Sequence, residues 1–291
     1  MSTSLILESA RKRAQAEKDA KQSISLLIVE GSIGVGKSTT IRNVMERFRS
    51  LGVSVISVEE PVDSWTSPVP LTTGEPSASL LERVYTNECS KIGFQIMALT
   101  QRYFRLENAL REARKRASLH NLNNEPLDVV VVSERSPLGD FLFAKLNLQS
   151  QSDLAMYFNV LGPIMEKVYE YIRCDVNIHI CHLHLDLPTI ADRIEQRGRL
   201  MEQQEANQIR NNPTSYVSRL SKMHDEMFNT TGESDKKYLS MAMDGFVLPP
   251  HIKNDYIQTI FDNKVSNVFT AGNVTVVTNA IMKIAHDAFD I

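Results

Sequence analysis

The chain has 291 residues, and 32 Lys or Arg against 35 Asp or Glu give it a formal net charge of −3. A chain with this balance lacks the excess of basic residues that is typical of nucleic-acid-binding proteins, so we expect no nucleic-acid partner. Its 3 cysteines have no CxxC spacing, which excludes a disulfide scaffold and fits a reducing compartment. Uninterrupted aliphatic runs such as 129–132 fall far short of the roughly 18 residues that a membrane-spanning helix needs. We therefore expect a cytoplasmic protein with no membrane partner.

Residues 1–22 differ in composition from the chain that follows. Their charged stretch, rich in Ala, Lys and Glu, predicts a solvent-facing helical extension ahead of the core. A mitochondrial transit peptide is the alternative, but such peptides are poor in acids, and this segment contains Glu8, Glu17 and Asp19. Residues 23–291 are expected to form one domain.

Short β-branched or aliphatic runs alternate with helical stretches from this point on. Strands are expected at 25–29, 53–58, 127–132 and 178–185, with a weaker one within 265–277. Because these runs are continuous rather than alternating, both faces of each strand should be covered. The pattern predicts an α/β fold, a five-stranded parallel sheet of doubly wound type with helices on both faces.

Three helices are expected between these strands. The first has apolar residues at the spacing of one buried stripe, namely Ile41, Val44, Met45 and Phe48. The other two are expected at 91–116 and 154–173, the last of them bent at Gly162-Pro163. A helix with Asp186 as its N-cap is expected after the fourth strand.

The sharpest signal is a GxxxxGK[ST] motif that directly follows the first expected strand and precedes the first helix. The motif and the residue after it comprise Gly31, Ser32, Ile33, Gly34, Val35, Gly36, Lys37, Ser38 and Thr39. Backbone N–H groups of such a loop converge on phosphate oxygens, and the helix N-terminus adds its dipole. Lys37 would neutralise the β and γ oxygens of a nucleotide, and Ser38 would ligate Mg²⁺. The motif indicates a fold like that of the P-loop NTPases.

A phosphate loop alone does not separate kinases from GTPases. The guanine-binding NKxD motif of GTPases is incomplete, because Asn263 and Lys264 are followed by Val and Ser. Two acid-bearing segments, 59–65 and 133–136, follow expected strands. Since open α/β sheets bind ligands at the carboxyl ends of their strands, we expect these acids at the functional site.

The phosphate loop, the pair Glu60-Pro61 followed by Trp65, and the run Glu134-Arg135-Ser136 occur in the order found in deoxynucleoside kinases. Over about residues 25–228 the chain resembles that family. The resemblance implies transfer of the γ-phosphate of ATP to the 5′ hydroxyl of a deoxynucleoside, with Mg²⁺ as cofactor. It implies that Glu60 is the base, that Arg135 is its cationic partner, and that Glu134 holds Mg²⁺ opposite Ser38. A carboxylate beside a cation suits this role, because an attacking alcohol needs a proton acceptor within hydrogen-bond reach.

Selection of the nucleoside is assigned to the second helix and its neighbours. Gln95 and Arg102 are seven residues apart, so they share one helix face, and the resemblance implies that Gln95 pairs with the base. Arg102 together with Asp140 is similar to the cytosine and purine kinases of the family, and residues 134–145 are similar to deoxyadenosine kinases. We therefore expect deoxyadenosine as substrate, with deoxyguanosine and deoxycytidine as alternatives. The resemblance implies that Phe94 and Phe143 stack on the base and that Tyr85 and Glu202 bind the 3′ hydroxyl of the sugar. Trp65 is a further residue expected at the nucleoside site.

A cluster of arginines follows the fourth expected strand. Arg193 and Arg197 lie one turn apart, and Arg199 follows them. The resemblance implies that these residues form an arginine-rich lid over the transferring phosphate, as closing lids do. Past residue 228 the chain departs from the family, and residues 229–254 are expected to be an insertion. The resemblance also implies a homodimer or larger homo-oligomer.

Two other interpretations stay open at this point, and a third is set aside. A nucleoside monophosphate kinase of the thymidylate kinase type shares the fold but needs no carboxylate base. A non-catalytic structural relative would be expected to have lost the phosphate loop or the base, and both are intact here. A metal site at His179, Cys181, His182 and His184 is disfavoured, because strand alternation sends Cys181 to the face opposite His182 and His184.

Overall fold

The computed structural model describes residues 24–70, 76–121, 128–174, 176–228, 265–269 and 274–289. The expected N-terminal extension, 1–22, and the expected insertion, 229–254, lie outside the described residues. Among the described helices, none is both long and apolar enough to cross a membrane.

A parallel sheet forms the centre of the molecule, with the strand order β2-β5-β1-β6-β7. Its strands are β1 (Ile24–Glu30), β2 (Ser54–Val58), β5 (Val129–Glu134), β6 (Val176–His184) and β7 (Val265–Phe269). The four strong strand predictions are confirmed to within two residues at each end, and the weaker one is found at 265–269. β5 runs two residues further than predicted, so that Glu134 ends the strand and pairs in register with Val29 of β1.

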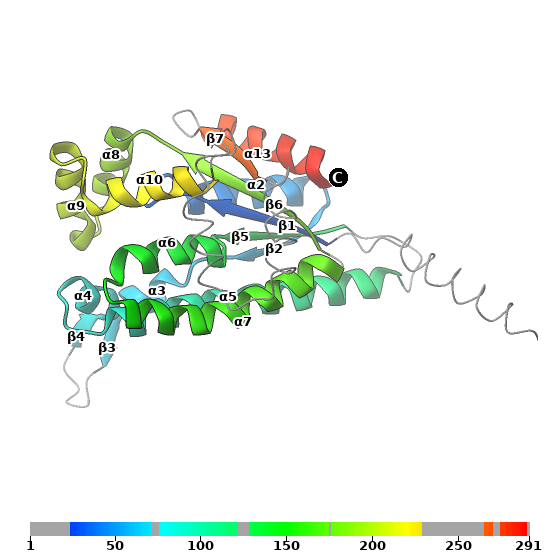
Figure 1. Cartoon of the computed structure of the whole chain (residues 1–291). Helices are drawn as coiled ribbons and strands as arrows, with labels where there is room; N and C mark the ends of the chain where they lie inside the picture. The colour runs from blue at the N-terminus through cyan, green and yellow to red at the C-terminus, as the bar shows by residue number, and fades with distance from the viewer. Residues whose placement is uncertain are drawn as a thin grey trace, which may run out of the picture.

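Helices cover both faces of the sheet, as Figure 1 shows. Apolar residues of α2 (Lys37–Ser50) and α13 (Val274–Phe289) pack on one face, and those of α5 (Lys91–Asn121), α6 (Pro137–Asn147) and α7 (Gln151–Cys174) pack on the other. The predicted stripe of α2 is buried, which confirms its orientation toward the sheet. α7 passes through Pro163 as a single helical span. The continuous apolar strands are buried for the reason predicted, since both of their faces meet helices.

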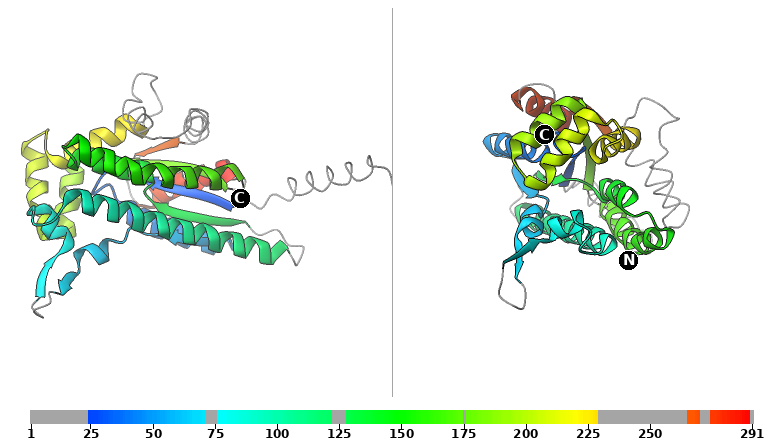
Figure 2. Two further views of the ribbon diagram at one scale, coloured as in Figure 1. Left: turned by 60° about the horizontal axis from the view of Figure 1, so that its bottom comes forward. Right: turned by 90° about the vertical axis from the view of Figure 1, so that its left-hand side faces the viewer.

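The smaller elements gather at one end of the molecule (Figures 1 and 2). They are α3 (Val62–Thr66), the antiparallel pair β3 (Pro68–Pro70) and β4 (Pro76–Ser79), α4 (Leu80–Tyr85), α8 (Leu187–Arg197), α9 (Leu200–Asn211) and α10 (Tyr216–Phe228). The strands of a parallel sheet all end at the same edge, and the phosphate loop follows β1 at this edge. The fold therefore brings segments far apart in sequence to one place.

Candidate active site

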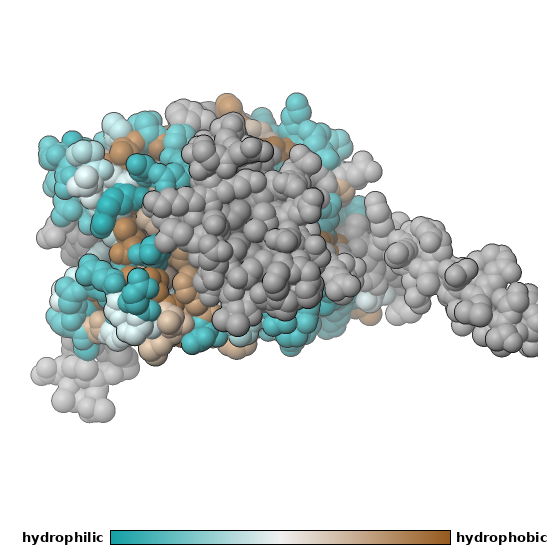
Figure 3. Space-filling view, in the orientation of Figure 1, coloured by the Kyte–Doolittle hydropathy of each residue, from teal (hydrophilic) through white to brown (hydrophobic). Residues whose placement is uncertain are grey.

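A cavity of about 860 Å³ opens at this end. Figure 3 shows apolar side chains at the surface there, between two hydrophilic rims. Most of the predicted site residues line the cavity. The exceptions are Gly31 and Ser32, which lie deeper in the loop, Asp140, which lies behind Arg102, and Glu202, whose side chain is outside the described part.

The phosphate loop folds around its own lysine. Gly31 adopts a φ of 142° and Gly36 a φ of 96°, a region that favours glycine. A Cβ at Gly31 would lie 2.6 Å from the carbonyl oxygen of Leu183, so no larger residue fits there. The Lys37 Nζ donates hydrogen bonds to the carbonyl oxygens of Gly31 (3.1 Å) and Ser32 (2.8 Å). Burial lowers the pKa of Lys37 to about 7, and the nearby positive charge of Arg135 adds to this effect.

Ser38 and Glu134 meet at the start of α2. The Ser38 Oγ donates to both carboxylate oxygens of Glu134, at 3.2 and 3.1 Å. A hydroxyl and a carboxylate are the hard oxygen ligands that Mg²⁺ accepts, and this ion usually completes its shell with water and phosphate oxygens. Within the described ranges no three His, Cys, Asp or Glu side chains cluster as a metal site. These two residues fit the role of a Mg²⁺ site that is completed by a nucleotide.

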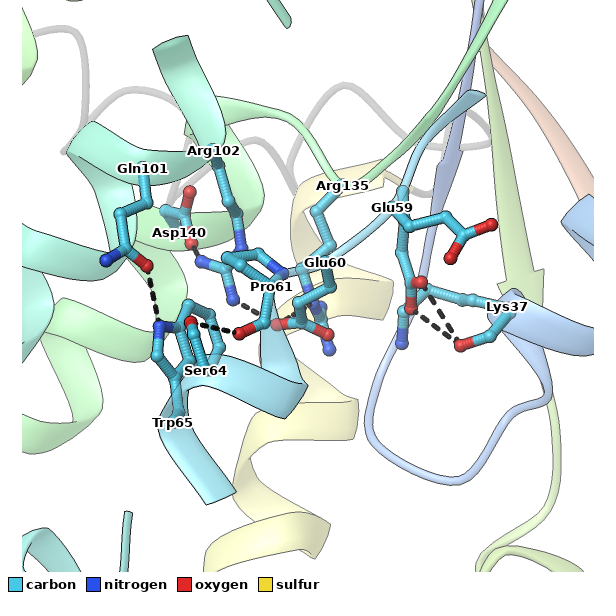
Figure 4. A network of polar contacts seen from close by, with 12 residues as sticks. Lys37, Glu59, Glu60, Pro61, Ser64, Trp65, Gln101, Arg102, Arg135 and Asp140 are labelled. Atoms are coloured by element: carbon cyan, nitrogen blue, oxygen red, sulfur yellow. Dashed lines mark hydrogen bonds and ion pairs between the residues drawn. The ribbon is translucent and has the colours of Figure 1, made fainter. Parts of the chain in front are cut away.

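A chain of ion pairs links α5, α6 and the segment after β2 (Figure 4). Arg102 pairs with Asp140 through Nη1 and with Glu60 through Nη2. The Nε of Arg135 lies 3.6 Å from the same Glu60 oxygen. The resemblance implied Arg135 as the partner of Glu60, and the structure adds Arg102 as a closer one. The base candidate and the base-reading candidates therefore form one electrostatic unit.

This unit determines the ionisation of Glu60. Burial raises its pKa, but the opposing charges of Arg102, Arg135 and Lys37 outweigh burial and hold the pKa at about 2. The carboxylate is consequently ionised throughout the physiological pH range. An ionised carboxylate at a cavity wall can accept a proton, which is the first requirement of a general base.

Aromatic side chains form one wall of the cavity. The Nε1 of Trp65 donates to the side-chain oxygen of Gln101 at 2.8 Å, which fixes the indole. Its ring centroid lies 5.4 Å from that of Phe94, and the guanidinium carbon of Arg102 lies 4.9 Å from the indole centroid. An apolar wall with a charged edge suits a flat heterocycle that carries polar groups.

Further lining residues come from α4, α5 and α6. Gln95 is only 5% exposed and lines the cavity beside the aromatic wall. Phe143 also lines it, with the guanidinium carbon of Arg135 4.5 Å from its ring centroid. Tyr85, at the end of α4, is 40% exposed at the cavity rim. The Gln95 and Arg102 pair shares a helix face, as the spacing predicted.

The arginines predicted to form a lid lie in and just after α8 and line the cavity. Asp186 caps α8 by accepting a hydrogen bond from a backbone N–H of the first turn at 2.9 Å, which confirms the predicted start of this helix. The Arg193 Nη1 donates to the carbonyl oxygen of Val35 at 2.8 Å. Arg197 and Arg199 line the same cavity. One guanidinium group thus contacts the phosphate loop, and the other two arginines line the cavity that this loop shares.

Sequence reasoning missed several residues of the site. Glu205 of α9 lines the cavity, and burial raises the pKa of its carboxyl. Tyr216 of α10 also lines it and accepts a hydrogen bond from the Asn147 Nδ2 at 3.1 Å. Asn147 lines the cavity too, and no pattern in the chain marks Glu205, Tyr216 or Asn147. Glu30, buried at the end of β1, did carry a signal, since an acid closes an apolar strand directly before the glycine loop.

The sequence profile described as "Deoxynucleoside kinase" matches residues 27–266, which is most of the chain. The chain belongs to the deoxynucleoside kinase family. The resemblance read from the phosphate loop, the Glu-Pro pair and the Glu-Arg-Ser run is thereby confirmed at the level of the family.

A curated relative matches over a short segment. The thymidine kinase of Ictalurid herpesvirus 1 (strain Auburn) is 56% identical over 39 residues, which are 13% of this chain and 16% of that protein. Among solved structures, deoxyadenosine kinase from M. mycoides with bound dCTP is similar with a TM-score of 0.49 and 18% identity, covering 90% of this chain and 99% of that one. EHV4-TK complexed with TP4A is similar with a TM-score of 0.49 and 15% identity, covering 91% of each chain.

Proposed function

We propose that this family member is a deoxynucleoside 5′-kinase that uses ATP and Mg²⁺, with deoxyadenosine as its preferred acceptor. The observation that carries the proposal is the position of Glu60. Its ionised carboxylate lines the same cavity as the phosphate loop, the lid arginines and Gln95. A donor phosphate and an acceptor alcohol held in that cavity would meet beside a proton acceptor.

In the proposed reaction the 5′ oxygen of the nucleoside attacks the γ-phosphorus of ATP. The new bond joins the 5′ oxygen to that phosphorus, the bond to the β–γ bridging oxygen breaks, and ADP leaves with its electrons. The proton of the alcohol passes to the Glu60 carboxylate. Mg²⁺, where Ser38 and Glu134 hold it, would offset charge on the phosphate oxygens. Lys37 and the lid arginines stabilise the transferring group.

A carboxylate whose pKa is about 2 is a weak base in the ligand-free protein. Two of the cations that depress this pKa, Arg135 and Lys37, face the phosphate side of the cavity. Bound phosphate anions would offset these cations, and the pKa of Glu60 would rise toward its ordinary value. The site therefore supports a base that becomes effective only when the donor is bound.

Preference for an amino-bearing base is supported by Arg102 and Asp140. Asp140 does not line the cavity itself, but it pairs with Arg102, which does, and its second carboxylate oxygen is buried without a hydrogen-bond partner among the described residues. In the proposal, a bound base brings an exocyclic amino group to this unmet acceptor beside Arg102, which a methyl group could not do. Adenine, cytosine and guanine carry such a group and thymine does not.

The first experiment measures turnover of the wild-type protein and of Glu60→Gln. We expect Glu60→Gln to lower kcat by about 100- to 10,000-fold, the usual contribution of a general base, while the Kd for nucleoside changes little. The matched control is Glu59→Gln, because Glu59 is the exposed neighbour of Glu60. Unchanged turnover of Glu60→Gln would show that this carboxylate is not the base.

The acceptor is tested with a panel of substrates at low concentration. Deoxyadenosine should have the highest kcat/KM, followed by deoxyguanosine or deoxycytidine, and thymidine the lowest. Thymidine monophosphate is included because a kinase of the thymidylate type would phosphorylate it in preference to every nucleoside. Failure to turn over any acceptor, with no binding of ATP in a titration, would favour a structural relative.

We also propose that the chain forms a homodimer or larger homo-oligomer. Large apolar side chains are exposed on two helices that pack on each other, Phe104 on α5 (56% exposed) and Met156 on α7 (53%). Burial of such side chains against a second copy would remove apolar surface from water.

A further inference from the structure

Glu30 is a buried carboxylate that the proposed reaction does not use. It is the last residue of β1 and 0% exposed. We propose that Glu30 is a positioning residue for phosphoryl transfer, which fixes the backbone turn from which Arg135 reaches Glu60 and the phosphate loop. The proposal rests on the proposed function, in which Arg135 is the cationic partner that holds the Glu60 carboxylate in place.

The first step is the contact between Glu30 and the start of α6. The Oε1 of Glu30 accepts hydrogen bonds from the backbone N of Ser136 (2.5 Å) and from its Oγ (2.6 Å). The carboxylate also lies against Gly139, where an added Cβ would be 2.6 Å from both oxygens. The first turn of α6 thus packs against this one side chain, which is also hydrogen-bonded to the N-cap residue of the helix.

The second step is the conformation of the residue before that turn. Arg135 has a φ of 68°, a left-handed conformation that is unusual for a residue other than glycine. Its backbone N donates to the carbonyl oxygen of Val29 at 3.1 Å, and its Nη1 donates to that of Gly31 at 2.9 Å. Residues 29, 30 and 31 therefore hold residues 135 and 136 together. A non-glycine residue keeps such a conformation only where its surroundings impose it, often at functional sites.

The third step concerns the cost of burying this acid. The Oε2 of Glu30 is buried without a hydrogen-bond partner among the described residues. Burial raises the pKa of Glu30, and the charges of Arg135 and Lys37 with the Ser136 hydrogen bonds act against that rise. Stability alone does not favour a buried carboxylate with an unpaired oxygen. Holding Arg135 in register with Glu60 supplies a functional reason for it.

The test is a double-mutant cycle between Glu30 and Arg135. Initial rates are measured for Glu30→Ala in the wild-type background and in Arg135→Gln, with the best acceptor of the substrate panel. In the wild-type background we expect kcat to fall by about 100-fold, because a displacement of about 1 Å at a reacting site has an effect of that size, while KM for nucleoside stays within about threefold. In Arg135→Gln the same substitution should change kcat by less than about threefold, because no guanidinium is left to position.

A merely structural role gives a different result. Partial unfolding caused by Glu30→Ala would lower kcat by the same factor in both backgrounds, and this additive outcome would overturn the proposal. If Arg135→Gln alone left kcat unchanged, the role of Arg135 would be wrong and the inference would fall with it. If Arg135→Gln were slow but Glu30→Ala matched the wild type, only the role of Glu30 would be refuted.

A milder variant covers the case in which Glu30→Ala does not fold. Ser136→Ala removes the hydrogen bond from the hydroxyl to Glu30 (2.6 Å) and the N-cap contact of the hydroxyl with the backbone N of Gly139 (3.2 Å). We expect kcat to fall by about tenfold in the wild-type background and by less than about twofold in Arg135→Gln. Its matched control is Ser150→Ala, which removes a similar hydroxyl contact at the start of α7, to the backbone N of Asp153 at 3.3 Å. The control should keep the wild-type kcat, and an equal loss in Ser136→Ala and Ser150→Ala would contradict the proposal.

Discussion

Lys37 shows how burial changes the chemistry of a single residue. Because burial and Arg135 lower its pKa to about 7, the ammonium begins to lose its proton near neutral pH in the ligand-free protein. The loss occurs as pH rises, and it removes the positive charge that attracts the donor phosphates. We therefore expect kcat/KM for the triphosphate to fall as pH increases above about 7. The measurement is a pH profile of kcat/KM from about pH 5.5 to about pH 9.5, which extends roughly 1.5 units below and 2.5 units above this pKa.

A matched control for this profile is Lys37→Arg. A guanidinium keeps its proton throughout the same range, so the decrease above neutral pH should disappear even if the rate is lower at every pH. A wild-type profile that stays flat up to pH 9 would contradict the lowered pKa. Glu60, with its pKa at about 2, should add no acidic limb in this range.

Asp140 allows base selection to be tested as a ratio between two acceptors, in which any common effect on catalysis through Arg102 cancels. Its carboxylate contacts Arg102, whereas Arg102 makes its own separate contact with Glu60. Asp140→Asn should lower kcat/KM for deoxyadenosine by about tenfold or more relative to thymidine, because a hydrogen bond to a charged group is lost. The matched control is Asp63→Asn, the same chemical change at an exposed position of α3. An unchanged ratio between the two nucleosides would remove Asp140 from base selection.

At the scale of elements, the first turn of α6 leaves no room at Gly139. A Cβ there would lie 2.6 Å from both carboxylate oxygens of Glu30. Gly139→Ala should therefore lower the free energy of unfolding by about 1–3 kcal/mol, as overpacking does. Gly93→Ala in α5 is the comparison, since its Cβ would be no closer than 3.5 Å to Ser90, and it should raise that free energy by about 0.5–1 kcal/mol.

Urea unfolding of both glycine variants measures these differences, with fluorescence of Trp65 as the probe. The opposite signs separate a local collision from a general effect of adding a methyl group. Equal stability of Gly139→Ala and the wild type would show that Glu30 can move away from α6, and would weaken its assignment as a rigid contact.

The end of β5 shows a strand boundary that the local hydrophobic pattern was not sufficient to predict. Apolar runs predicted the strands, but the run at 129–132 ends before Ser133 and Glu134, which complete β5. Both residues pair with β1, and Glu134 is buried beside Ser38. The polar side chains of these two residues do not fit the apolar pattern of a buried strand. Pairing with β1 nevertheless makes them part of β5, because tertiary contacts outweigh the local strand preference here.

At the scale of the whole molecule, the proposed assembly makes a separate prediction. If α5 and α7 contact a second copy, Phe104→Glu with Met156→Glu should convert the oligomer to monomer, because charges are disfavoured at the core of an interface. Light scattering of the purified protein measures the mass. Leu51→Glu is the matched control, since Leu51 is 59% exposed at the end of α2 and should leave the mass unchanged. A monomeric wild-type protein would contradict the proposal.

The sequence by itself determined the strands, the phosphate loop and the family, because these depend on local hydrophobic patterns and on residues at fixed spacing. It also placed Gln95 and Arg102 on one helix face, since helical periodicity is a local property.

Only the tertiary structure decided the electrostatics of the site. Arg102 meets Glu60 across 42 positions of the chain, and Glu30 meets Ser136 across 106. Such contacts depend on the order of the strands in the sheet, and no local pattern contains that order. For the same reason the depressed pKa of Glu60 and the approach of Glu205 and Tyr216 to the cavity could not be derived from the residues alone.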